Sequence, residues 1–137
     1  MLALLLCLVA VNQEPPKPEA DPVAQLQGTW RLVQVAYDGK TEKPDFERVF
    51  TIQEDRITPS DRVDDVATFK LDATKSPAWI DLTDRGGRVS QGIYRLSGRR
   101  LELAMEEGEG PRPETFEAPR QSKSKIVVLV LERARTR

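Results

Sequence analysis

The segment from Gly28 to Gly39 constrains the fold of this chain more than any other part of its sequence. Trp30 stands near the start of a run of β-forming residues, and that run ends in Asp38-Gly39. An Asp-Gly pair favours a two-residue turn with positive φ at both positions, so the chain is predicted to reverse there as a hairpin. A tryptophan just inside the first strand of a small β domain is expected to plug one end of its core.

Beyond Gly28, turn signals recur about every eight to twelve residues, which is the spacing of an all-β domain. Strands are predicted over residues 29–37, 47–54, 65–72, 78–83, 89–96, 100–105, 114–117 and 125–132. Tight connections and the absence of a long helical pattern favour an antiparallel up-and-down meander of eight strands. Such a sheet avoids exposed edges by closing into a barrel, so the first and last strands are expected to pair. The last strand, from Ile126 to Leu131, is apolar on both faces, which indicates cover on both sides.

The N-terminal part of the sequence has a different composition. Residues 1–12 are uncharged and mostly apolar, too short to span a bilayer and typical of the core of an export signal. We therefore expect an exported protein, periplasmic or extracellular, with a lipid anchor at Cys7 as the less favoured alternative. Residues 13–21, rich in Pro and Glu, are predicted to be a linker, and residues 22–137 the folded domain. Asp21 can cap a short helix that begins at Pro22.

Composition excludes several classes of function. Among 137 residues the chain has 21 Lys and Arg, 22 Asp and Glu, no His, and Cys7 as its one cysteine. The near balance of charge leaves no basic stripe, so nucleic acid is not an expected partner. A Ser-His or Cys-His catalytic pair, a zinc cage and an internal disulfide all need residues that the chain lacks. No cofactor and no metal site are predicted.

Several blocks of the sequence resemble one family. The Gly28-Thr29-Trp30 opening resembles the lipocalin signature. Together with Leu26-Gln27, Phe69 to Leu82, Gly92-Ile93-Tyr94 and Arg112 to Phe116, it resembles a group of small lipocalin-like domains known mainly from planctomycete-type bacteria. The resemblance covers residues 24–133 and implies an all-β, eight-stranded lipocalin-like barrel with a short N-terminal helix. It implies no activity, because none is established for that group.

The resemblance also implies how one end of the barrel is closed. In lipocalins the tryptophan of the Gly-x-Trp signature packs under the barrel floor, and a basic residue after the last strand covers it. Gly28 and Trp30 match the signature, and Arg133 or Arg135 is expected to supply the cover through a cation–π contact.

Aromatic residues are the candidates for a binding site. If the barrel interior holds a ligand, Phe50, Phe69, Trp79, Tyr94 and Phe116 are expected to line it. In the alternative, the same residues fill the core of a protein-interaction or structural domain. The first reading predicts a non-enzymatic binding module for a small apolar ligand. The second predicts a protein partner at the strand ends and loops.

Carboxylates give a third, less favoured reading. Asp72 and Asp81 lie on either side of Thr74 and Pro77, and two carboxylates can share acid and base roles in a hydrolase or help to hold Ca²⁺. The structural alternative is that Asp72 and Thr74 bond backbone N–H groups in a turn before the next strand. We therefore do not predict an enzyme.

Overall fold

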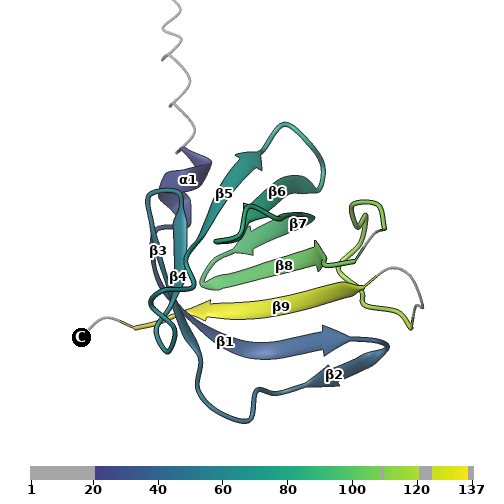
Figure 1. Ribbon diagram of the computed structural model, residues 1–137, viewed down its shortest axis with the longest axis horizontal. Helices are drawn as coiled ribbons and strands as arrows, with labels where there is room; N and C mark the ends of the chain where they lie inside the picture. Colours follow the sequence, from purple (N-terminus) through teal and green to yellow (C-terminus); the bar gives the residue numbers. More distant parts are fainter. Residues whose placement is uncertain (1–20, 109, 121–124, 136–137) are drawn as a thin grey trace, which may run out of the picture.

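The computed structural model of the protein describes residues 21–108, 110–120 and 125–135 (Figure 1). The predictions for residues 1–12, including Cys7, and for nearly all of the linker lie outside the described residues. Within the described ranges, no helix has the length and apolar character needed to cross a membrane.

One short helix precedes nine strands. The helix α1 covers Pro22–Gln25, and Asp21 caps it as predicted, its Oδ1 accepting a hydrogen bond from the Val23 N–H at 3.2 Å. The strands are β1 (Gly28–Tyr37), β2 (Lys40–Glu42), β3 (Val49–Gln53), β4 (Arg56–Pro59), β5 (Ala67–Asp72), β6 (Ala78–Thr83), β7 (Val89–Ser97), β8 (Arg100–Glu106) and β9 (Ile126–Arg133).

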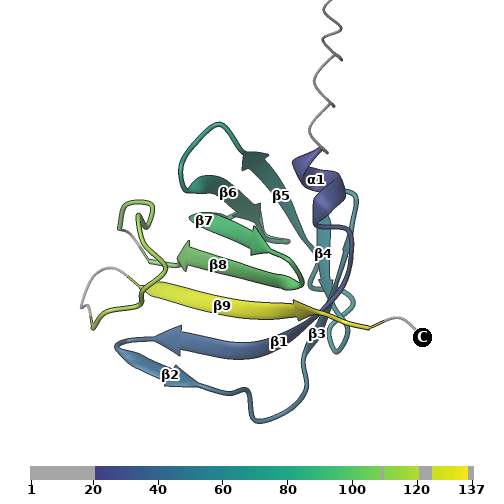
Figure 2. The ribbon, with the colours of Figure 1, turned by 180° about the vertical axis from the view of Figure 1, so that it is seen from behind.

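The strands form an antiparallel barrel that closes between β1 and β9. Eight strands follow one another around it in the order β1-β3-β4-β5-β6-β7-β8-β9, and β2 is added beside β1. Figures 1 and 2 show β9 running alongside β1 in both views. The predicted all-β, lipocalin-like barrel and the pairing of its first and last strands are confirmed.

Alternation along the strands divides the apolar residues between two sides of the sheet. The inner face carries the main core, which includes Trp30, Ile52, Phe69, Ile80, Tyr94, Leu101 and Leu131. Residues of the outer face form a second cluster around Ile93, Ala104 and Val128. A register shift between Leu32 and Gln34 in β1 keeps Val35 facing the main core.

The predicted hairpin at Asp38-Gly39 is present, with φ of 48° and 75°, and it joins β1 to β2. β2 was not predicted from the sequence because it has three residues, all of them exposed. The predicted strand over 47–54 is shorter, and a turn at Glu54, with φ of 56°, leads directly into β4, which was also missed. Only two residue pairs join β4 to β5, whereas seven join β8 to β9.

The predicted strand over 114–117 is wrong. These residues belong to an irregular segment, residues 111–119, that bends at residues 114–116 and pairs with no strand of the described chain; we call it the strap. Prolines at 111, 113 and 119 lack the N–H groups that a ladder needs. In Figures 1 and 2 the connection that contains the strap lies beside the ends of β8 and β9 remote from Arg133.

Candidate functional site

Trp30 forms the floor of the barrel. Its side chain is fully buried, and its indole N–H donates to the Leu26 carbonyl at 2.9 Å. The Arg133 guanidinium lies 4.3 Å from the centre of the Trp30 rings and donates to the carbonyls of Gln27 at 2.6 Å and Gln25 at 2.8 Å. Arg133 therefore ties the last strand to the segment of α1, whereas Arg135 is exposed.

Gly28 is needed where this floor meets the first strand. Its φ is 127°, and a Cβ atom there would lie 2.9 Å from Nη1 of Arg133. Gly28, Trp30 and Arg133 thus meet at one end of the barrel, and their contacts are those of a structural plug.

The five aromatic candidates for a ligand site divide between the two faces of the sheet. Phe50, Phe69 and Tyr94 face the interior, where they pack in or against the main core. The prediction that Trp79 and Phe116 face the interior is corrected. Ile80, the neighbour of Trp79, takes the inward position in β6, and Phe116 packs in the outer cluster.

Apolar residues form a continuous row across the outer face of the sheet. Register pairs align Trp79 with Ile93, Ile93 with Ala104, Ala104 with Val128, and Val128 with Ala36. Phe116 and Ala118 of the strap pack on this row, and Val128 is 5% exposed beneath them. The cover predicted for both faces of β9 is confirmed, and the strap supplies its outer part.

Arg112 clamps the strap to the barrel. Its Nη1 donates to the Gly92 carbonyl at 2.7 Å and to the Ile80 carbonyl at 3.3 Å. Its Nη2 lies 2.8 Å from Oδ1 of Asp81, as an ion pair without the alignment of a hydrogen bond. The guanidinium also lies 4.2 Å from the ring centre of Trp79. Arg112 thus joins three blocks of sequence that are separated along the chain.

Further contacts hold the ends of the strap. The Gly39 N–H donates to the Ala118 carbonyl at 2.6 Å. Glu106, buried at the end of β8, accepts from the backbone N–H groups of Gly108 and Lys125, both at 2.8 Å. These bonds connect the strap to the hairpin of β1 and β2 and close the chain between β8 and β9.

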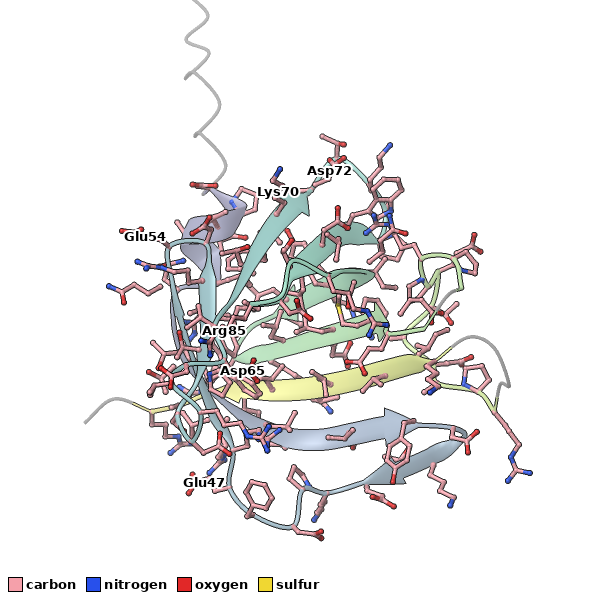
Figure 3. The ribbon with its side chains drawn as sticks, viewed as in Figure 1. Glu47, Glu54, Asp65, Lys70, Asp72 and Arg85 are labelled. Atoms are coloured by element: carbon pink, nitrogen blue, oxygen red, sulfur yellow. The ribbon has the colours of Figure 1, made fainter. Side chains whose placement is uncertain are left out.

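The two candidate carboxylates lie on the outer face, each beside a specific partner. Asp72 accepts from the Thr74 hydroxyl at 2.5 Å and from its N–H at 3.1 Å, and these bonds lower the pKa of the Asp72 carboxyl. Asp81 belongs to the Arg112 clamp. Figure 3 shows Asp72 with Lys70 near the end of β5, on the far side of the molecule from Glu47. The bonds to Asp72 are those of the predicted turn.

Three hollows on the surface meet at Arg95 and Phe116, and together we call them the outer groove. A hollow of about 460 Å³ at the barrel rim is also lined by Gln25, Ser76, Pro77, Ala78, Tyr94 and Leu96. A second, of about 400 Å³, runs along the strap past Glu114, Thr115 and Glu117. The third, of about 370 Å³, continues toward β2 past Val130, Val128, Ala36 and Thr41.

The centre of the outer groove is charged. The Arg95 guanidinium lies 4.3 Å from the ring centre of Phe116, and its Nε donates to Oε2 of Glu102 at 2.6 Å. Nε of Arg100 lies 3.9 Å from the other oxygen of the same carboxylate. We call Arg95, Glu102 and Arg100 the triad. These residues were not predicted as a site from the sequence, because charged residues in alternating strand positions are ordinary surface residues.

Within the described part of the chain, no group of three or more His, Cys, Asp or Glu side chains is placed to hold a metal ion. The chain matches no protein-family model, no curated protein and no solved structure. The relation to planctomycete-type lipocalin-like domains therefore stays a prediction from the sequence, and the function has to be argued from the geometry.

Proposed function

We propose that this protein is a non-enzymatic binding domain whose barrel is a filled scaffold and whose binding surface is the outer groove. The observation that carries the proposal is that three hollows meet at Arg95 and Phe116, two on the outer face and one at the barrel rim. By contrast, Phe50 and Phe69, expected to line an internal cavity, contribute to the core. Of the alternatives predicted from the sequence, this geometry favours the protein-interaction domain.

The length of the outer groove favours an extended segment of another polypeptide as the partner. The groove reaches from Ala78 in β6, across β7, β8, β9 and β1, to Thr41 in β2. Five inter-strand steps of about 4.8 Å amount to roughly 24 Å. An extended chain covers that distance with about seven residues. The groove is lined by both apolar and polar groups, and an extended segment can present its alternating side chains and its main chain to both kinds.

The carboxylates support a non-enzymatic role. Hydrogen bonds from Thr74 favour the ionised form of the Asp72 carboxyl, and the Asp81 carboxylate is paired with Arg112. A general acid needs a raised pKa, which is the opposite of what the bonds to Asp72 produce.

Selection from a library of displayed random peptides of about ten residues, long enough to span the groove, tests this proposal. We expect selected peptides to bind the protein about tenfold more weakly after Arg95→Ala, because that change removes the centre of the groove. Arg56→Ala is the matched control. The side chains of Arg56 and Arg95 are each paired with a carboxylate, and they are similarly exposed, at 54% and 56%. A library that yields no binder, or binders indifferent to Arg95, would overturn the proposal.

A small apolar ligand is the second candidate. The hollow at the rim brings Tyr94 and Phe116 together with Pro77 and Leu96, and its volume of about 460 Å³ is within the range of small-molecule sites. Native mass spectrometry of protein recovered from its own compartment distinguishes the two candidates. A retained small molecule supports this ligand, whereas the mass of the polypeptide alone supports the filled scaffold.

We also propose export, on the composition of residues 1–12. N-terminal sequencing of the protein recovered outside the cytoplasm tests this. A mature chain that begins after the apolar segment supports export, and an intact N-terminus on cytoplasmic protein contradicts it.

A further inference from the structure

We infer that the outer groove selects a polypeptide segment with one acidic side chain placed over Arg95 and an apolar side chain on the rim side of it. This inference rests on the proposed function, and it names the chemistry of the partner.

The triad contains two guanidinium groups and one carboxylate. Glu102 lies directly opposite Arg95 in the β7–β8 ladder and is bonded to it, while Arg100 approaches its second oxygen. The Glu102 side chain is 20% exposed, but those of Arg95 and Arg100 are 56% and 53% exposed. The triad therefore has a net positive charge, and its cationic groups are the parts open to a partner.

The net positive charge of the triad becomes unfavourable when a partner covers it, unless the partner compensates that charge. An occupant that lies over Arg95 removes water from a guanidinium, and loss of that water is unfavourable unless another acceptor replaces it. A carboxylate meets the need best, because a guanidinium can bind it through two parallel hydrogen bonds. Phe116 already holds the guanidinium plane at 4.3 Å, so less side-chain freedom is lost on binding.

The groove lining on each side of the triad determines which side chains the partner segment can place next to its acidic residue. On the rim side the groove is lined by Pro77, Ala78 and Leu96, where Arg95 is the one charged residue among the described lining. On the other side Val128 and Val130 line the groove but are 5% and 3% exposed, so they offer a partner little apolar surface. An apolar side chain on the rim side of the acidic residue is therefore expected to gain from burial.

Acidic residues of the strap limit the number of negative charges in the partner. Glu114 and Glu117 line the groove and are exposed. They repel additional carboxylates, so a single acidic position is favoured over an acidic run. Removal of the Glu117 charge is accordingly expected to strengthen the binding of an acidic segment.

The test uses the peptides selected on the full-length protein. We expect one aligned position to be acidic, and a synthetic peptide with Gln in place of that Glu to bind about tenfold more weakly. The same Glu-to-Gln change in the peptide is expected to have little effect on binding to the Arg95→Ala protein, because that protein already lacks the guanidinium that the peptide carboxylate would contact. Glu117→Gln is expected to tighten binding of the acidic peptide, and Arg56→Ala to leave it unchanged.

The outcomes separate this inference from the proposed function. Peptides that depend on Arg95 but show no acidic position overturn the acidic selectivity and leave the groove as the binding surface. Peptides that bind equally well to the Arg95→Ala protein, or the absence of any binder, overturn both. Circular dichroism of each variant establishes that the barrel is folded, so that weakened binding is assigned to the groove.

Discussion

Replacement of Arg112 by alanine is expected to loosen the strap and lower the stability of the barrel. The side chain is 13% exposed and connects the strap to β6 and β7 through the carbonyl of Gly92, the carboxylate of Asp81 and the ring of Trp79. Each of these contacts disappears with the guanidinium, and alanine replaces none of them.

The size of the effect follows from the contacts. A hydrogen bond from a charged donor contributes about 1.5–3 kcal/mol, and we count only the shorter bond, that to Gly92. The cation–π contact contributes about 0.5–1 kcal/mol at this half-exposed ring. The ion pair with Asp81, whose side chain is 38% exposed, contributes about 0–1 kcal/mol. We expect the free energy of unfolding to fall by about 3 kcal/mol.

Urea denaturation followed by far-ultraviolet circular dichroism measures this change. Arg120→Ala is the matched control, because Arg120 directly follows the strap and is exposed. It is expected to change the free energy by less than about 0.5 kcal/mol. Hydrogen exchange at the Gly39 N–H, which donates to the Ala118 carbonyl of the strap, should also become faster in the Arg112→Ala protein. Equal free energies of unfolding for the Arg112→Ala and Arg120→Ala proteins would refute the proposed role of Arg112.

The ion pair can be separated from the rest of the clamp by a double-mutant cycle. Asp81→Asn alone is expected to cost less than Arg112→Ala, since the bond to Gly92 remains. The coupling between the two changes measures the pair, and a coupling near zero would assign the whole effect to the carbonyl bonds and the ring.

Three other predictions concern the floor, a close contact and pH. Arg133→Ala is expected to lower the free energy of unfolding by about 2–4 kcal/mol, because it removes two hydrogen bonds to carbonyls and the contact with Trp30. Arg135→Ala, at an exposed position, should have little effect. Equal urea midpoints for the two variants would contradict the role of Arg133 in closing the barrel floor. Gly92→Ala is expected to cost about 1–3 kcal/mol, because a Cβ there would lie 2.4 Å from the Ala104 carbonyl oxygen and 2.3 Å from the sulfur of Met105; Gly86→Ala, whose nearest contact is an ordinary 3.5 Å, is the control. Hydrogen bonds from Thr74 lower the pKa of Asp72 in the folded protein. Ionised Asp72 therefore stabilises the fold at pH values above the ordinary pKa of an aspartate. This stabilisation is lost as the pH falls through the lowered pKa of the folded state. The difference in urea midpoint between wild type and Asp72→Asn should therefore shrink on acidification below about pH 4, and a difference that grows would contradict it.

The barrel could be predicted from local sequence signals. Asp38-Gly39 specifies a turn by itself, and the two apolar faces between Ile126 and Leu131 require cover on both sides whatever the topology. These signals depend on residues close together in the chain, which is why they held. β2 and β4 were missed because they have three and four residues and too few alternating positions to form a pattern.

The site was less predictable because it depends on contacts between distant segments. Nothing in the sequence near Arg112 indicates that its partners are Gly92 and Asp81, 20 and 31 positions away. Trp79 is an aromatic residue in a β run, and only the position of Ile80 on the inner face shows that Trp79 points outward. Phe116 suggested a strand, but the neighbouring prolines place it in a strap.

The unequal ladders around the barrel have a mechanical consequence. Long ladders of seven pairs join β7, β8, β9 and β1, and the strap crosses this part of the sheet. The ladder between β4 and β5 has two pairs, beside one hydrogen bond from the Phe69 N–H to the Asp55 carbonyl. The molecule is thus a stiff arc with a two-stranded flap, β3 and β4, hinged on the first half of β1. Opening along the β4–β5 seam would expose the inner face of the arc while the outer surface and its strap stayed intact.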